Sequence, residues 1–173
     1  MSLGYFELFG LSPAFHIDLA TLEKNYRAIQ SAAHPDFFVT ASASDKLQSM
    51  QTATLANEAY RSLKNPANRA KYLLELQGIN AVAESNTTMS AEFLIQQMEW
   101  REYLEDSKAK KNIKALESLL IQMETEAKKL QLSLGDLLDT KKDYKAATED
   151  TRKLIFIDKV CADINNAIEQ LEN

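Results

Sequence analysis

The sequence predicts an all-α protein. Only 4 glycines and 3 prolines occur among its 173 residues, which is too few for the many tight turns of a β-sandwich or barrel. Alanine, leucine, glutamate, lysine and glutamine dominate instead, and these residues favour helices. The length of the chain fits one compact domain or two small ones.

Four helices are predicted in the first part of the chain, at about 3–9, 19–33, 44–63 and 67–76. Gly10 and Gly78 follow the first and fourth helices as natural stops, and Asp18 is a good N-cap for the second helix. The second helix ends before His34, because Pro35 disfavours a helical conformation in the residue that precedes it.

Apolar residues at helical spacing mark the sides that are expected to be buried. The stripe in the second helix consists of Leu22, Tyr26, Ile29 and Ala33, and Lys24 and Arg27 lie opposite. The third helix is expected to bury Leu47, Met50, Thr54, Leu55 and Ala59 or their near neighbours.

Residues 79–90 are polar and poor in large apolar groups, and they are interpreted as a linker. Three long helices are predicted after it, at about 91–107, 110–132 and 136–171, with Ser133 to Gly135 separating the last two. Their short loops favour antiparallel packing as a three-helix bundle. Its expected core contains Ile113, Leu116, Leu120, Met123, Leu130, Leu154, Ile157, Cys161, Ile164, Ile168 and Leu171. The predicted organisation is one domain at 1–78, a linker at 79–90 and a second domain at 91–173.

The charge balance argues against a nucleic-acid partner. The net charge is -5, and residues 1–78 carry as many basic as acidic side chains, so the excess of acid lies in residues 79–173. No apolar run approaches the ~20 residues of a membrane helix, and the N-terminus does not resemble a signal peptide. The single cysteine, Cys161, cannot form an intramolecular disulfide and indicates a reducing compartment. We expect a cytoplasmic protein without membrane partners.

The loop His34-Pro35-Asp36 combines three groups that suit the recognition of a partner. Proline fixes the turn, Asp36 offers an acceptor to a partner arginine or a local amide, and His34 can both donate and accept. Lys24 and Arg27 on the preceding helix are available to an acidic partner surface. Alone, the tripeptide is weak evidence, because X-Pro-Asp turns are common.

An enzyme built around His34 as a general base beside Asp36 is the alternative from another class. No serine or cysteine is placed to act as its nucleophile, and His16 has no evident partner. Two histidines and one cysteine at scattered positions give no metal-ligand spacing. We therefore expect a protein that is not an enzyme and uses neither metal nor cofactor.

The predicted helix that begins near residue 91 has two apolar sides. Phe93, Trp100 and Leu104, with Gln97 between them, share one side, and Leu94, Ile95, Met98, Glu99, Glu102 and Asp106 share a different one. Either the helix is central and both sides are buried, or the second side is exposed. Burying its acids without partners would be costly, and an exposed apolar patch with an acidic rim indicates a protein-binding surface. Phe156 lies off the core stripe of the last helix, either as a side-packing residue or as an extension of this patch.

The N-terminal region resembles a J-domain. The resemblance rests on Tyr5-Phe6, Leu8-Phe9, Tyr26-Arg27, His34-Pro35-Asp36, Asn57-x-Ala59-Tyr60-x-x-Leu63, Pro66, Arg69 and Tyr72. It implies a four-helix J-domain that binds a DnaK-type chaperone through His34, Pro35, Asp36, Lys24 and Arg27 and stimulates its ATP hydrolysis. The second helix is less basic than in general J-domains, which suits a dedicated chaperone.

The remaining segments narrow the resemblance to the HscB-type J-domain co-chaperones of iron–sulfur cluster assembly. They are Arg69-Ala70-x-Tyr72-Leu73-Leu74, Phe93-Leu94-Ile95-x-Gln97-Met98-Glu99-x-Arg101-Glu102 and Arg152-Lys153-Leu154-x-Phe156-x-Asp158-Lys159. This resemblance implies a dedicated HscA-like chaperone, and a C-terminal bundle that holds the scaffold IscU. The matching positions are Leu94, Ile95, Met98, Glu99, Glu102, Asp106 and Phe156. The alternative is a J-protein that serves a general DnaK-type chaperone and an unrelated client, and a pull-down would discriminate between them.

Overall fold

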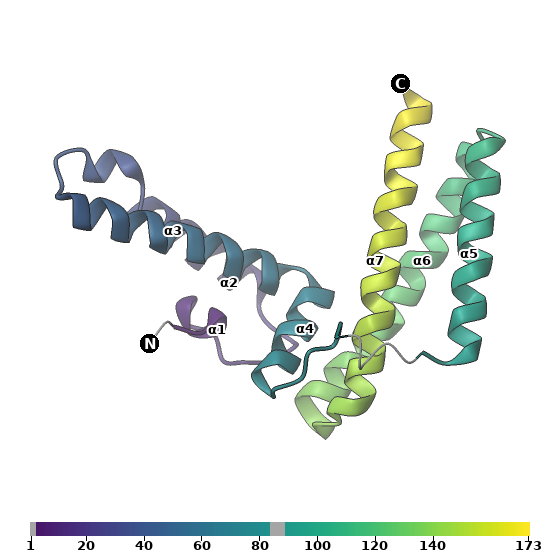
Figure 1. Cartoon of the computed structure of the whole chain (residues 1–173), viewed down its shortest axis with the longest axis horizontal. Coiled ribbons are helices and arrows are strands. Elements are labelled where there is room, and N and C mark those ends of the chain that lie inside the picture. Colours follow the sequence, from purple (N-terminus) through teal and green to yellow (C-terminus); the bar gives the residue numbers. More distant parts are fainter. Residues whose placement is uncertain (1–2, 84–88) are drawn as a thin grey trace.

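Helices form every regular element that the structure describes, and they group into two arms (Figure 1). The computed structural model describes residues 3–83 and 89–173. The first arm contains α1 (Tyr5–Leu8), α2 (Leu19–Ala32), the 3-10 turn η1 (Pro35–Phe38), α3 (Ala43–Lys64) and α4 (Pro66–Leu76). The second contains α5 (Ala91–Ala109), α6 (Ile113–Gly135), the π-helical turn η3 (Asp136–Lys141) and α7 (Tyr144–Glu172). This confirms the all-α prediction. The predicted linker falls partly on residues 84–88, outside the described residues, and the domain boundaries stay a prediction.

The first arm is built around an aromatic core. Its fully buried members are Phe6, Phe9, Leu22, Ala59 and Leu63. Tyr26 of α2 stacks on Tyr60 of α3 with ring centroids 4.0 Å apart, and its hydroxyl donates to Asn57 Oδ1 at 2.6 Å. The residues that carry the resemblance to J-domains therefore meet in space. Asp18 caps α2 as expected, because its side chain accepts from the Ala20 amide at 3.1 Å.

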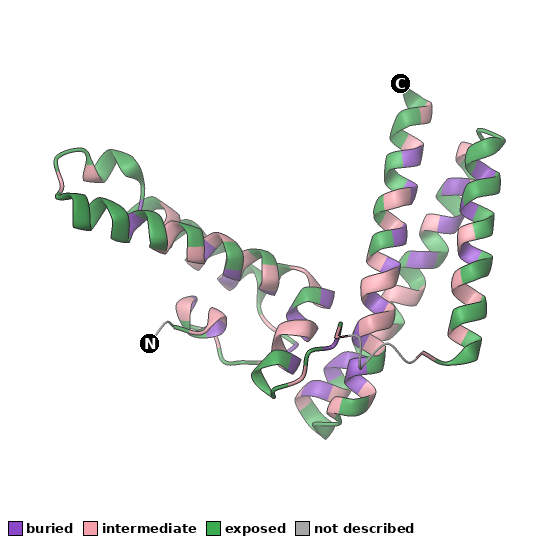
Figure 2. Cartoon of the chain, in the orientation of Figure 1, coloured by how far each residue is buried: buried purple, intermediate pink, exposed green. Residues whose placement is uncertain are grey.

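The prediction for the third helix is only partly confirmed: Ala59 is buried as expected, whereas Leu47, Met50 and Thr54 are exposed. Its buried residues are Ser49, Ala56, Ala59 and Leu63. In contrast, Leu47 is 56% exposed, Met50 is 64% exposed, and Thr54 is also exposed. The small residues let α3 lie close to α2, and α1 and α4 also pack against α3. Figure 2 shows the half of α3 next to η1 as mostly exposed.

The second arm is a bundle in which α5 lies beside an antiparallel pair formed by α6 and α7 (Figure 1). The buried members of its core are Trp100, Leu104, Leu116, Leu119, Met123, Ile157, Val160, Ile164 and Ala167. Leu154 is buried nearer the junction of the arms. The other predicted core residues of α6 and α7, including Leu120, Leu130 and Cys161, are half-buried. The core stripes of both helices are therefore confirmed in direction, although Leu119 is buried and the predicted Leu120 is half-buried.

The prediction that Ser133 to Gly135 separates the last two helices is wrong. Helix α6 runs through Gly135 and continues into η3, and the chain turns at Lys142, which has a φ of 55°. Asp143 then caps α7 by accepting from the Ala146 amide at 3.2 Å. Gly135 is buried within this continuous helical segment, and a β-carbon there would overlap the imidazole of His16. Its role is close packing rather than helix termination.

Candidate functional site

The loop at the free end of the first arm holds its three predicted residues in the exposed positions that a partner site needs. His34 precedes η1, and its Nδ1 accepts from the Asp36 amide at 3.2 Å. Because Nδ1 accepts this bond, the proton of a neutral imidazole lies on Nε2, where it can be donated to a partner. The Asp36 carboxylate is 86% exposed. The histidine therefore shapes the turn, and the aspartate is presented to solvent.

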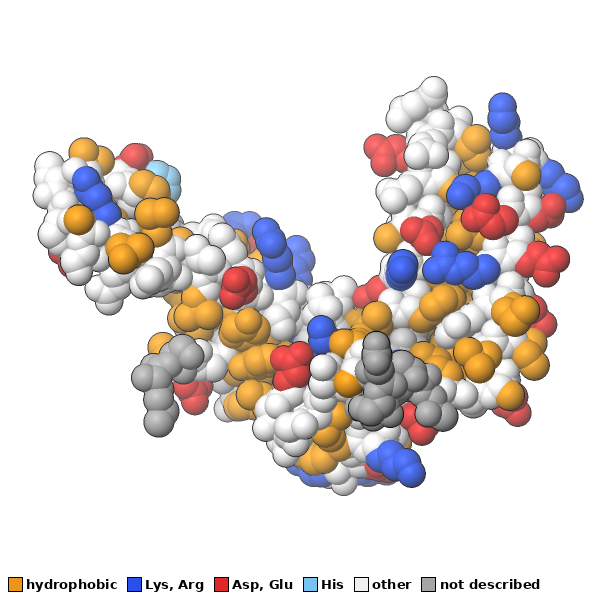
Figure 3. Space-filling model, viewed as in Figure 1, with side chains coloured by type: hydrophobic (Ala, Val, Ile, Leu, Met, Phe, Trp, Pro, Cys, Tyr) orange, Lys and Arg blue, Asp and Glu red, His pale blue; other side chains and the backbone are white. Residues whose placement is uncertain are grey.

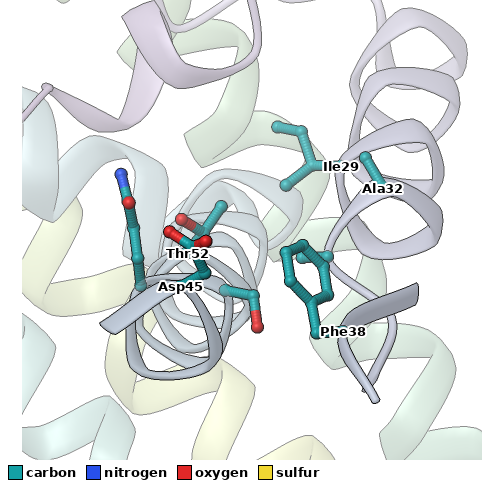
Figure 4. A pocket seen from close by; sticks show the side chains of 8 residues that line it. Ile29, Ala32, Phe38, Asp45 and Thr52 are labelled. Atoms are coloured by element: carbon teal, nitrogen blue, oxygen red, sulfur yellow. The ribbon is translucent and has the colours of Figure 1, made fainter. Parts of the chain in front are cut away.

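A second aromatic residue anchors this loop to the helices beneath it. Phe37 is exposed, whereas Phe38 is half-buried between α2 and α3. Figure 4 shows the Phe38 ring beside Ile29 and Ala32 at the edge of a hollow of about 350 Å³. The hollow is lined by Ile29, Ala32, Ala33, Phe38, Asp45, Gln48, Ser49 and Thr52. Sequence reasoning assigned no role to Phe38, although an aromatic residue directly after the turn is a signal for such an anchor.

The basic residues of α2 lie at the surface, as expected. Lys24 and Arg27 are both exposed. Arg27 Nη2 lies 2.7 Å from Glu23 Oε1, one helical turn earlier. An exposed pair of this kind contributes little to stability and is screened by salt. Arg27 can therefore exchange Glu23 for an acidic group on a partner at low cost.

Helix α5 presents one apolar side to the core and the other to solvent. Trp100 is 5% exposed and Leu104 is also buried. On the other side Leu94 is 47% exposed, Ile95 57% and Met98 71%. Of the two readings left open by the sequence, burial of both sides is therefore wrong. We call the exposed side the α5 patch, and it comprises Leu94, Ile95, Met98, Glu99, Glu102 and Asp106.

The acids of the α5 patch form a rim beside its apolar residues. Figure 3 shows apolar side chains bordered by acidic ones along α5. Glu99, Glu102 and Asp106 line a shallow hollow of about 680 Å³ together with Tyr103 and Glu105. Tyr103 is exposed and can offer a hydroxyl beside the acids. Sequence reasoning missed Tyr103 and Glu105, although both lie within a turn of the predicted acids.

Phe156 lies in an aromatic cluster at the edge of α5. Its ring centroid is 5.9 Å from that of Phe93 and 6.3 Å from that of Trp100. The Arg101 guanidinium lies 5.5 Å from the Phe156 ring centroid and is paired with Asp163 at 3.1 Å. Phe156 is thus a half-buried side-packing residue that supports the exposed side of α5 from behind.

The two groups of predicted site residues do not come together. The His34-Pro35-Asp36 loop lies near the end of one arm, and α5 lies on the outer side of the other (Figure 1). Within the described residues, no cluster of three or more metal-ligating side chains is present. In the same part of the chain, no helix is long and apolar enough to cross a membrane. The arrangement is one of two separate surfaces rather than one reaction centre.

Comparison with known proteins shows the family to which this chain belongs. The chain is 47% identical over 169 residues to the co-chaperone protein HscB homolog of Burkholderia thailandensis, covering 98% of this chain and 96% of the relative. The chain belongs to the HscB co-chaperone family. The family model described as the HSCB C-terminal oligomerisation domain matches residues 89–165.

Solved HscB structures share the same fold. HscB from Vibrio cholerae matches with a TM-score of 0.85 at 37% identity, covering 98% of this chain and 99% of that one. Human HscB matches with a TM-score of 0.85 at 29% identity, covering 95% and 81%. The chain is therefore an all-α J-protein of iron–sulfur cluster assembly that works with a chaperone. Its relatives are named co-chaperones, which confirms that the protein is not an enzyme.

Proposed function

We propose that this protein recruits an IscU-type iron–sulfur scaffold to a dedicated, HscA-like chaperone of the DnaK type and stimulates ATP hydrolysis by that chaperone. The observation that carries the proposal is the two-sided helix α5. It buries Trp100 and Leu104 while exposing Leu94, Ile95 and Met98. Exposed apolar side chains lower the solubility of a protein that has no partner to cover them. Contact with a partner would explain why these three residues are exposed.

The chaperone surface in this proposal consists of His34, Pro35, Asp36, Lys24 and Arg27. Asp36 is placed to accept a charge-assisted hydrogen bond from a cationic group of the chaperone. Lys24 and Arg27 attract an acidic surface and bring it toward the loop. The loop is short and anchored by Phe38, so little conformational entropy is lost when it binds.

The scaffold surface consists of the α5 patch, with Phe156 behind it. Its chemistry selects a partner surface in which an apolar area adjoins basic side chains. Leu94, Ile95 and Met98 would supply the buried centre of the interface, and Glu99, Glu102 and Asp106 its charged rim. Methionine suits a contact that must adapt to its partner. A cytoplasmic location is part of the same proposal.

Calorimetric titration of the full chain tests both halves of the proposal. The scaffold and the chaperone are each added to the co-chaperone alone, and ATP hydrolysis is then measured with all three proteins. We expect binding of each partner and faster hydrolysis when the co-chaperone is present. Binding to a general DnaK-type chaperone but not to the HscA-like protein would favour the broader J-protein alternative. Absence of scaffold binding would contradict the role of the second arm.

A further inference from the structure

The hollow beside the His34-Pro35-Asp36 loop is continuous with the proposed chaperone surface. It measures about 350 Å³ and lies between α2, η1 and α3 (Figure 4). Residues on both sides of the loop line it, because Ala33 directly precedes His34 and Phe38 ends η1. Pockets that hold small ligands typically measure ~300–1,000 Å³. A single long side chain of a bound partner is therefore an occupant of the right size.

The hollow has a closed floor and an open rim. Ala33 and Ser49 line its floor and are only 7% and 8% exposed. At the rim, Ala32, Asp45 and Gln48 are exposed. The space exists because two successive alanines face it from the end of α2, where larger side chains would fill it. A side chain of a partner can therefore enter from solvent without displacing either helix.

The two walls of the hollow differ in chemistry. Figure 4 shows Asp45 and Thr52 of α3 on one side, facing Ile29 and Ala32 of α2 and the Phe38 ring on the other. Lysine and arginine bury their apolar stems along such a wall while their charged heads stay among polar groups. A purely apolar side chain would leave the polar wall unpaired, and the Asp45 carboxylate would repel an acidic one. The lining therefore fits a basic side chain best.

The Asp45 carboxylate is available to receive a charged head. The Asp45 backbone amide donates to Ser42 Oγ at 3.1 Å, which caps α3 without using the carboxylate. No ion pair to this carboxylate occurs in the part of the chain that the structure describes. Asp36 carries a second exposed acid at the same end of the arm, whereas Lys24 and Arg27 lie further back on α2. The surface thus changes from basic to acidic toward the loop, which defines one orientation for a partner of complementary charge.

We infer that the hollow is a second docking site for the chaperone, and that a lysine or arginine side chain of the chaperone occupies it. The stem of that side chain lies against Ile29, Ala32 and Phe38, and its head forms a charge-assisted hydrogen bond with Asp45. This inference rests on the proposed contact between the first arm and the chaperone. The hollow discriminates among chaperones, because one without a basic side chain at this place leaves it unfilled and gains less affinity.

Substitutions on both walls test the inference in the full chain. Ala32→Leu fills the hollow from an exposed position, and leucine is a good helix former. Ala20→Leu is its matched control, because Ala20 is exposed on the same helix and lies outside the hollow. Asp45→Asn removes the charge and keeps the backbone bond to Ser42, and Asp45→Lys reverses the charge. Glu58→Gln, which removes an exposed acid elsewhere on α3, is the control for both.

Calorimetric titration with the chaperone measures the contact. The dissociation constant should rise about tenfold for Ala32→Leu and for Asp45→Asn, as for the loss of an interface residue worth somewhat more than ~1 kcal/mol. It should rise further for Asp45→Lys and stay at the wild-type value for both controls. The double variant Ala32→Leu with Asp45→Asn should bind about as weakly as the weaker single variant, because both changes remove the same contact. Melting temperatures and affinity for the scaffold should stay near the wild type.

The inference is overturned if Ala32→Leu and Asp45→Asn bind the chaperone as tightly as the wild type. Losses that add in the double variant would contradict it too, since the two walls would then contact different groups. Wild-type affinity for Asp45→Lys would exclude a cationic occupant.

Two other occupants have distinct signatures, and each would contradict the inference. A loss of scaffold affinity in Ala32→Leu would assign the hollow to the scaffold. Self-association of the wild type in sedimentation experiments, abolished by Ala32→Leu, would assign it to a second copy of this chain. If the wild type did not bind the chaperone at all, the proposed function would fail together with the inference. Binding by the wild type with no effect of these variants would refute the inference alone.

Discussion

Changing the exposed apolar residues of α5 to alanine distinguishes a role in binding the scaffold from a role in stabilising the fold. Leu94, Ile95 and Met98 are 47%, 57% and 71% exposed, so roughly half or less of each side chain is removed from water by folding. Since full burial of such a side chain is worth ~1.5–3 kcal/mol, each change to alanine should cost at most about 1.5 kcal/mol of stability. Loss of even one binding anchor costs ~2 kcal/mol, or about thirtyfold in the dissociation constant for the scaffold.

Trp100→Ala, on the other side of the same helix, should give the opposite result. Trp100 is 5% exposed, and such truncations cost ~3–5 kcal/mol. The buried Nε1 of Trp100 has no hydrogen-bond partner within the described residues, so the lower end of this range is expected. A loss of ~3 kcal/mol lowers the melting temperature by roughly 6–12 °C in a chain of this size.

Calorimetry with the scaffold and thermal melting by circular dichroism measure the two effects. The double variant Ile121→Ala with Leu132→Ala is the control, because both residues are large, apolar and exposed on α6, outside the α5 patch. It should bind the scaffold normally and melt near the wild type. The reasoning is refuted if the triple variant Leu94→Ala, Ile95→Ala, Met98→Ala unfolds while Trp100→Ala is harmless. A stable triple variant that binds the scaffold normally refutes it equally.

Three further predictions concern the His34-Pro35-Asp36 loop, the basic residues of α2 and the contact between the two arms. His34→Gln or Asp36→Asn should abolish ATPase stimulation without changing the melting temperature, because both residues are exposed; a variant that unfolds would show a structural role. Arg27→Glu should slow association with the chaperone and flatten its salt dependence in stopped-flow measurements, while Glu23→Gln should not slow it. Burial raises the pKa of Asp158, so its contribution to stability is present below about pH 4 and is lost as the pH rises through the folded pKa. Urea unfolding from pH 4 to 7 should therefore show Asp158→Asn gaining stability relative to the wild type as the pH rises; a parallel pair of curves would contradict this.

The fold class and both candidate surfaces could be predicted because they depend on local patterns. Asp18 caps α2 as its position indicated. The spacing on a helical wheel placed Trp100 and Met98 on different sides of α5, and the structure confirms this separation. These features require no knowledge of which helices meet, since the periodicity of one helix defines its sides.

Helix α3 shows where this reasoning fails. It carries one stripe with the large residues Leu47 and Met50 and another with the small residues Ser49 and Ala56. Size alone favours burial of the larger stripe, but the structure buries the smaller one. Close approach of two helices favours small residues at the contact, and the identity of that contact is a tertiary property. The same limit left the α5 patch with two readings until the neighbouring helices were placed.

The junction could not be predicted, because its contacts join distant segments and its residues have ordinary local readings. Gly135 resembles a helix stop, and Asp139 resembles a surface acid near a turn. Their roles emerge once His16 and Phe15 lie beside them. Gly135 lies under the imidazole ring of His16, and the Asp139 carboxylate accepts hydrogen bonds from two backbone amides. Both contacts require accurate placement of the two arms. Apolar packing of two domains alone would not require this accuracy. The proposed surfaces for the chaperone and the scaffold lie at the far sides of the two arms that these contacts join.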